Sequence, residues 1–104
     1  KGAPEVLLAR SNYYFDGTKV LPLGEEQKKA FREAYMELAR NGLRTLAMAK
    51  RVLPKGIKLD ADDVENDLVL LGVVGIIDPP RPEVYDAIQT AGKAGIDVVM
   101  ITGD

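Results

Sequence analysis

The segment Asp78-Pro79-Pro80-Arg81-Pro82 limits the possible folds of this chain more than any other feature of its sequence. A proline ring fixes φ and removes the backbone N–H, so neither a helix nor a central strand continues through this segment. The residue before each proline is also held extended. The segment therefore predicts a stiff linker and the best domain boundary in the chain.

The residues on either side of the linker predict a βαβ unit. Residues 68–77 are apolar on both faces, which is typical of an interior strand. Residues 83–94 place apolar side chains on one helical face, and residues 96–101 follow as a second buried strand. In a βαβ unit the two strands are parallel and the crossover is right-handed.

The residues before position 68 predict helices mixed with strands, so the predicted fold class is α/β. Asp16-Gly17 lies between two strand-forming runs and indicates a hairpin with a two-residue turn. Residues 25–40 form the clearest helix, with an apolar face of Phe31, Tyr35 and Leu38. The remaining expected elements are a short helix at 5–10, strands at 13–15, 18–21 and 45–50, and a polar loop at 54–67 with one helical turn.

Composition restricts the chemistry that the chain can perform. Its 104 residues include neither cysteine nor histidine, which excludes a disulfide scaffold, a zinc ribbon and a Ser-His-Asp triad. Residues 1–58 carry a net charge of +6 and residues 59–104 a net charge of −8. A basic half suits an anionic ligand, although uneven surface charge explains the split equally well. We expect no nucleic-acid partner.

Two cationic positions are candidates for phosphate binding. Lys1 and Gly2 precede a helix start, where an ammonium and backbone N–H groups can meet a phosphate, and a glycine permits close approach. Arg44 lies between a helix stop and a strand, where a guanidinium can bind a polyphosphate through its planar fork. The alternative for each is a solvated surface cation.

The chain ends on a further candidate site, Thr102-Gly103-Asp104, which follows an apolar run. At the carboxyl edge of a parallel sheet, the threonine hydroxyl can bond a phosphoryl oxygen and the aspartate can help hold Mg²⁺. An ordinary turn is the alternative for this segment.

Four segments of the chain occur in an order that resembles the P-type cation-transporting ATPases, most closely their calcium-pump-like branch. They are Lys-Gly-Ala-Pro-Glu at 1–5, Leu-Arg-Thr-Leu-Ala at 43–47, Asp-Pro-Pro-Arg at 78–81 and Met-Ile-Thr-Gly-Asp at 100–104. The resemblance covers essentially the whole chain.

This resemblance implies a division into parts of two domains. Residues 1–77 are similar to the C-terminal part of a nucleotide-binding domain, with antiparallel strands and flanking helices. Residues 78–82 are similar to a hinge, in which the role of Arg81 is mainly positional. Residues 83–104 are similar to the start of the re-entry into a phosphorylation domain of haloacid-dehalogenase-like fold.

The resemblance also implies the cofactors ATP and Mg²⁺ and a role for each candidate residue. Lys1 and Gly2 would line the adenosine pocket, Arg44 would contact the ATP phosphates, and Leu46 would pack near the base and ribose. Thr102, Gly103 and Asp104 would sit beside the transferring phosphoryl group, with Asp104 near Mg²⁺ as part of an incomplete metal site.

The family forms an aspartyl-phosphate in an Asp-Lys-Thr-Gly-Thr sequence, which these 104 residues lack. The resemblance therefore implies a non-catalytic fragment of an ATP-hydrolysing membrane pump, lying on the cytoplasmic side. Its partners would be the remaining nucleotide-binding, phosphorylation, actuator and membrane domains. The absence of an initiator methionine and the strand-like end also lead us to expect a piece of a longer protein.

Two other functions stay open at this point: a fragment of a haloacid-dehalogenase-like phosphatase and a non-catalytic α/β interaction module. An incomplete sheet would leave unpaired strand edges, so we also expect a strand-paired or swapped dimer.

Overall fold

The computed structural model describes residues 1–103 and follows the predicted order of elements up to residue 93. The helices are α1 (Pro4–Ala9), α2 (Glu25–Arg40), α3 (Ala61–Val64) and α4 (Glu83–Lys93). The strands are β1 (Ser11–Phe15), β2 (Val20–Pro22), β3 (Arg44–Lys50) and β4 (Leu68–Ile76).

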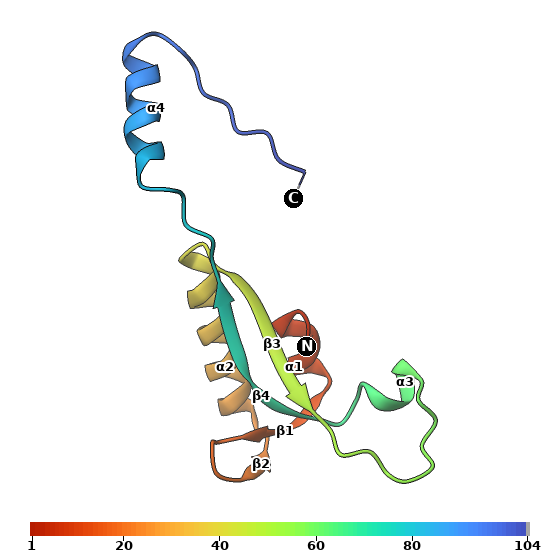
Figure 1. Ribbon diagram of the computed structural model, residues 1–104. Helices are drawn as coiled ribbons and strands as arrows, with labels where there is room; N and C mark the ends of the chain where they lie inside the picture. Colours follow the sequence, from red (N-terminus) through yellow and green to blue (C-terminus); the bar gives the residue numbers. More distant parts are fainter. Residues whose placement is uncertain (104) are drawn as a thin grey trace.

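The four strands form one mixed sheet in the order β2-β1-β4-β3 (Figure 1). β1 pairs antiparallel with β2, and β3 pairs antiparallel with β4. β4 lies in the interior of the sheet, as predicted, but its pairing with β1 is parallel. The expected antiparallel strands are thus present in two pairs, and the third pair is parallel because α2 and β3 return the chain so that β4 runs beside β1 in the same direction.

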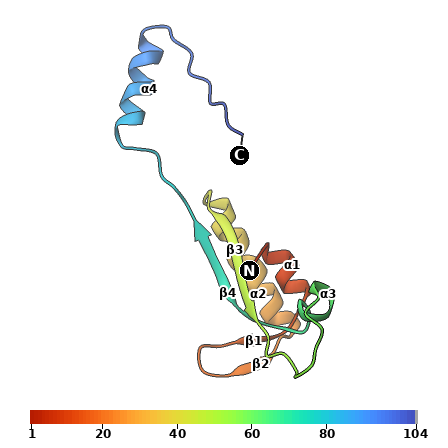
Figure 2. The same ribbon diagram turned by 45° about the vertical axis from the view of Figure 1, so that its right-hand side comes forward.

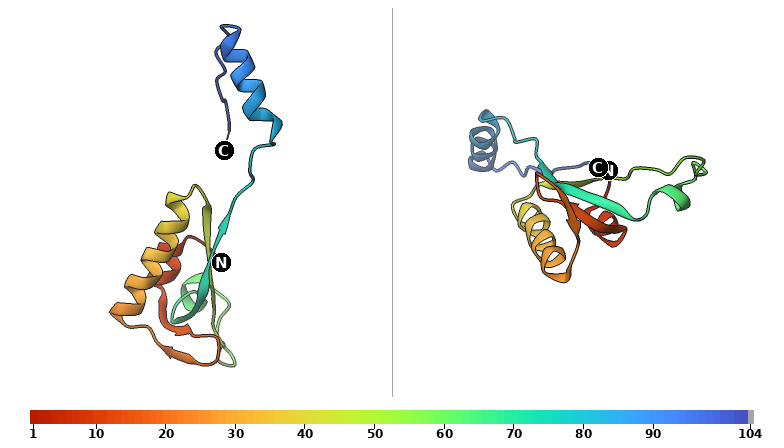
Figure 3. Two further views of the ribbon diagram at one scale, coloured as in Figure 1. Left: turned by 90° about the vertical axis from the view of Figure 1, so that its left-hand side faces the viewer. Right: turned by 90° about the horizontal axis from the view of Figure 1, so that it is seen from below.

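Helices α1 and α2 cover the same face of the sheet, and the core lies between them and the strands (Figure 3). Five buried apolar residues make up this core: Leu7, Leu8, Leu23, Ala47 and Leu70. Tyr14 and Phe31 pack against them, and the ring of Phe31 meets that of Tyr35 edge to face at 5.8 Å. The apolar face predicted for residues 25–40 thus packs toward the sheet.

The β1–β2 hairpin differs from the predicted two-residue turn. Phe15 pairs with Val20, so residues 16–19 form a four-residue loop closed by a hydrogen bond from the Asp16 N–H to the Lys19 carbonyl. The Asp16 carboxylate accepts from the Thr18 and Lys19 N–H groups, at 2.8 Å each, and these bonds stabilise the longer loop. Pro22 ends β2 at the sheet edge, where a missing N–H costs no ladder bond.

The predicted buried strand at residues 96–101 is wrong. These residues form neither a helix nor a strand, and Val99, Met100 and Ile101 are 77%, 87% and 92% exposed. A strand needs a neighbour to pair with, and both edges of β4 are already taken by β1 and β3. The βαβ unit expected from residues 68–101, on either side of the linker, is therefore not formed in the described residues.

The proline linker carries α4 away from the sheet (Figures 1 and 2). The molecule measures 66 × 30 × 20 Å, and its radius of gyration is 20.1 Å. A compact chain of this length has a radius of gyration of about 13 Å. The chain therefore leaves the sheet at the proline linker, and the domain boundary at residues 78–82 stays a prediction.

Candidate functional site

The sheet face opposite α1 and α2 is uncovered, and we call it the open face. It presents the alternate residues of β3 and β4 that point away from the core: Arg44, Leu46, Met48, Lys50, Val74 and Ile76. Met48, Val74 and Ile76 are 37%, 39% and 51% exposed. The open face is thus an apolar strip with a cation at each end of β3, and the predicted burial of both faces of residues 68–77 is wrong in this structure.

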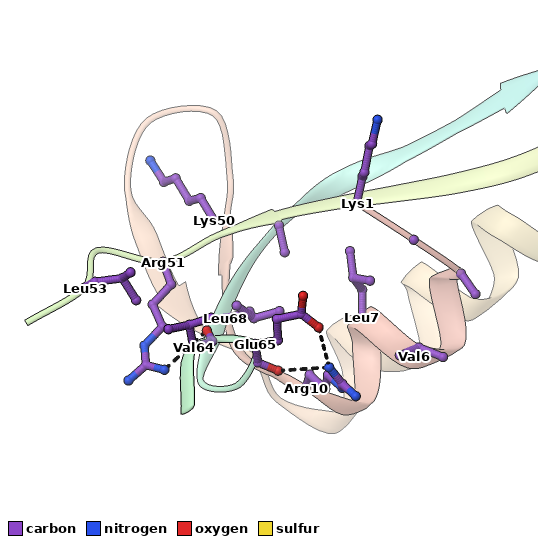
Figure 4. Close-up of a pocket in the computed structure, with 13 residues that line it drawn as sticks. Lys1, Val6, Leu7, Arg10, Lys50, Arg51, Leu53, Val64, Glu65 and Leu68 are labelled. Carbon is purple, nitrogen blue, oxygen red and sulfur yellow. Dashed lines mark hydrogen bonds and ion pairs between the residues drawn. The ribbon is translucent and has the colours of Figure 1, made fainter. Parts of the chain in front are cut away.

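Lys1 lies on the open face because the backbone of Gly2 pairs with β3. The Gly2 N–H donates to the Ala47 carbonyl at 3.1 Å, and the Ala47 N–H donates to the Gly2 carbonyl at 2.9 Å. This antiparallel pairing places Lys1 opposite Met48, on the side away from the core. Figure 4 shows the Lys1 side chain leading away from Leu7 of α1.

Gly2 has a packing role that its sequence context did not reveal. A Cβ at this position would lie 3.1 Å from Leu7 Cδ1, so the glycine lets α1 approach β3 closely. The predicted reason for a glycine here was close approach of a phosphate. In the structure, the hydrogen of Gly2 that a side chain would replace faces α1, on the side opposite to Lys1.

Arg44 and Leu46 lie on the same face as Lys1, so the structure brings three of the predicted site residues together. Arg44 begins β3 and pairs with Ile76, the last residue of β4. Leu46 pairs with Val74 and is partly buried. The Arg44 guanidinium therefore lies at the end of the sheet that leads into the linker.

Lys50 is a further cation on the open face that sequence reasoning missed. Its Nζ lies 5.2 Å from the centre of the Phe15 ring, within the range of a cation–π interaction. The period-two alternation of Arg44, Leu46, Met48 and Lys50 was visible in the sequence and would have placed Lys50 on this face. The position of Phe15, two strands away, was not visible.

The third predicted segment does not join this site in the described residues. Thr102 and Gly103 lie in the exposed segment after α4, and Asp104 lies outside the described residues. Residues 1–103 contain no group of three or more carboxylates that would hold a metal ion. No helix in residues 1–103 combines the length and the apolar character needed to cross a membrane.

The segments at 1–5, 43–47 and 78–81 lie in a part of the chain that matches a known protein family. Residues 1–83 match the family of the P-type ATPase cytoplasmic domain N, so the chain belongs to that family. The resemblance to P-type cation-transporting ATPases that the sequence predicted is therefore confirmed.

Individual relatives are similar along the whole chain. It is 47% identical over 105 residues to a calcium-transporting ATPase of Bacillus subtilis. It is 42% identical over 112 residues to the sodium/potassium-transporting ATPase subunit alpha-2 of Gallus gallus and 43% identical to subunit alpha-3 of Homo sapiens. All of this chain is covered in each case, but it spans only 12%, 11% and 11% of the lengths of these relatives.

Proposed function

We propose that the open face forms one wall of an ATP site. The observation that carries this proposal is the Gly2–Ala47 bridge, because it sets Lys1 on the same face as Arg44 and Leu46. ATP needs an apolar surface for its base and cationic donors for its phosphates. Leu46 and Met48 offer the apolar surface, and no acidic residue occurs in any of the four strands.

The ends of β3 suggest an orientation for the nucleotide. Lys50 is engaged by the Phe15 ring, whereas no ion pair is formed by Arg44 within residues 1–103. We therefore place the phosphates at Arg44 and the base and ribose beside Leu46 and Lys1. The phosphates would then point toward the linker at 78–82 and the segment that follows it.

In this proposal the chain is a section of a longer P-type ATPase that hydrolyses ATP to move cations. Its relatives are named as calcium- and sodium/potassium-transporting ATPases, which supports this assignment over a phosphatase fragment or an interaction module. Residues 1–77 would belong to the nucleotide-binding domain, residues 78–82 to the hinge and residues 83–104 to the phosphorylation domain. The section would lie on the cytoplasmic side of a membrane-embedded parent.

Magnesium does not fit the described residues by themselves. Thr102 and Gly103 offer one hydroxyl and backbone groups, and hard cations prefer several carboxylate or carbonyl oxygens. The isolated chain also lacks the Asp-Lys-Thr-Gly-Thr nucleophile. We therefore propose that Thr102, Gly103 and Asp104 contribute to phosphoryl and Mg²⁺ binding only within the parent pump, and that the isolated chain does not turn over ATP.

An NMR titration with ATP tests the open face directly. We expect millimolar affinity, about −4 kcal/mol, with shifts at the amides of Lys1-Gly2, Arg44 and Leu46. Arg44→Ala should weaken binding about tenfold, because it removes a charge-assisted contact of about 1.4 kcal/mol. Arg32→Ala is the matched control, since the Arg32 side chain is exposed on α2, away from the open face. Equal affinities for both variants would contradict the proposal.

We also propose that the isolated chain pairs with a second copy along the outer edge of β3. Within residues 1–103, Gly2 bridges that edge at Ala47 alone, which leaves backbone groups on either side for another strand.

A further inference from the structure

A pocket of about 450 Å³ lies on the α1 side of β3, across the strand from the side chains of the open face (Figure 4). Its walls come from α1, the end of β3 and residues 51–67, which we call the flap. Lys1 and Lys50 border the pocket, but Figure 4 shows both side chains leading away from its other residues. The volume is in the range of small-molecule sites.

One part of the wall of this pocket is apolar, and the rest carries charged side chains. Leu7 of α1 and Leu68 at the start of β4 meet Leu53 and Val64 of the flap around the cavity. Leu7 is 7% exposed, whereas Leu53 is 38% exposed, so the apolar surface runs from the core to the opening. An apolar ligand body would gain free energy by covering this surface.

Two arginines flank the cavity, and each keeps unused donors. Nη1 of Arg10 lies 2.8 Å from Oε2 of Glu65. Nη1 of Arg51 donates to the Asp63 carbonyl at 2.9 Å and to Oδ1 of Asn66 at 3.0 Å. In residues 1–103, Nη1 is the donor in every hydrogen bond of both guanidinium groups. The N–H groups of Nε and Nη2 therefore remain available to donate to a ligand.

The charge balance of the cavity favours an anion. Glu65 is neutralised by Arg10, which leaves the positive charge of Arg51 without a carboxylate partner. Arg51 instead bonds to neutral carbonyl and amide oxygens. Lys1 and Lys50 add positive charge at the border of the pocket, and the planar fork of one guanidinium matches one carboxylate.

We propose that this pocket binds a small amphiphile with one carboxylate head and an apolar body. The carboxylate accepts from the spare donors of Arg51, and the body covers Leu53, Val64 and Leu68. The flap can admit such a ligand because its ion pair to the body is exposed: the side chains of Arg10 and Glu65 are 44% and 60% exposed. A hydrogen bond from Asn12 Nδ2 of β1 to Asp67 Oδ1, at 2.8 Å, also holds the flap, and exposed polar contacts of this kind contribute little to stability.

Titration of the 104-residue chain with octanoate, followed by NMR, tests the proposal. We expect saturable shifts at Ala49, Leu53 and Leu68, with Leu46 and Met48 of the open face unchanged. Octanol lacks the charge and acetate lacks the apolar body, so each should bind at least about tenfold more weakly. Added ATP should not displace octanoate, which separates this site from the proposed nucleotide site.

A pair of adjacent substitutions controls for effects on folding. Leu53→Asp puts a negative charge into the cavity and should weaken octanoate binding at least about tenfold. Val52→Asp makes the same change one residue earlier, at a side chain that is 91% exposed and does not line the pocket, and should leave binding unchanged. Equal binding of octanol, equal loss in both variants, or shifts confined to the open face would each overturn the proposal.

Discussion

Asp16 stabilises the β1–β2 loop through its carboxylate. The backbone N–H of Lys19, followed by that of Thr18, donates to this group and lowers the pKa of Asp16 below its ordinary value of 3.8. A carboxyl whose pKa is lowered by folding stabilises the folded state above its unfolded pKa. That contribution is lost as the pH falls through the folded pKa.

We therefore predict an acid-sensitive hairpin. In an NMR titration from pH 6 to about pH 2, the Asp16 carboxyl should titrate below pH 3.8, and the Thr18 and Lys19 amides should shift with it. Asp16→Asn keeps an oxygen acceptor but has no proton to bind, so those amide shifts should disappear. A titration midpoint at or above 3.8 would contradict this account of the loop.

Single residues of the open face were only partly predictable. Arg44 stood out because it lies between a glycine stop and a strand, and its position at the first residue of β3 agrees with that interpretation. The sequence predicted that Gly2 allows a phosphate to approach. Its close contact with Leu7 was not predicted, because that contact depends on how α1 packs against β3. Packing between elements distant in sequence is not encoded in a short motif, so such a role emerges only from the fold.

At the scale of elements, helices were predicted better than strand partners. Residues 25–40 carry an apolar period, acidic residues in the first turn and Arg40 in the last, and α2 has those bounds. The parallel β1–β4 pair joins residues more than fifty positions apart, and no local pattern selects that partner. At residues 96–101 the local pattern predicts a strand that does not form, because an apolar run becomes a strand only where a partner strand is available.

Two glycine substitutions separate packing from helix propensity. A Cβ at Gly75 of β4 would lie 2.5 Å from Leu43 Cδ2 and 3.1 Å from Leu38 Cδ2, so Gly75→Ala forces these leucine side chains to shift. We expect a loss of about 1–3 kcal/mol in the free energy of unfolding, measured by urea denaturation.

Gly92→Ala is the matched substitution in α4, where a Cβ would meet nothing within 4 Å. Alanine favours a helix over glycine by about 1 kcal/mol, so the helical signal in circular dichroism should rise. Because α4 stands apart from the sheet, the urea midpoint of the β-sheet body should not change. A destabilisation equal to that of Gly75→Ala would show that α4 is packed.

The whole molecule exposes more surface than a compact protein of its mass. Its accessible area is 8250 Å², whereas a compact 11.3 kDa chain exposes about 5,700 Å². Much of the excess is apolar and lies on the open face, α4 and residues 96–101. A core of five buried apolar residues is small for this length, so the fold needs further surface to cover these regions.

We predict that the isolated chain associates, because it exposes more apolar surface than a compact protein. Light scattering at rising protein concentration measures this association. We expect the mass to rise from that of one chain toward two as copies pair along β3. Thr45→Pro should reduce the association, because it removes an N–H from an edge strand. Lys55→Pro serves as the control, because Lys55 is the second residue of the turn closed by the Ile57 N–H and the Pro54 carbonyl, a position that favours proline. A monomer at every concentration would refute strand pairing.

The central position of β4 has a consequence for synthesis on the ribosome. β4 supplies a partner to both β1 and β3, yet it is the last strand of the sheet to be made. Until residue 76 has left the exit tunnel, the β1–β2 hairpin has no strand that joins it to β3. About three-quarters of this chain must therefore be synthesised before the nine-residue strand β4 can complete the sheet. During that time the incomplete sheet can bind chaperones.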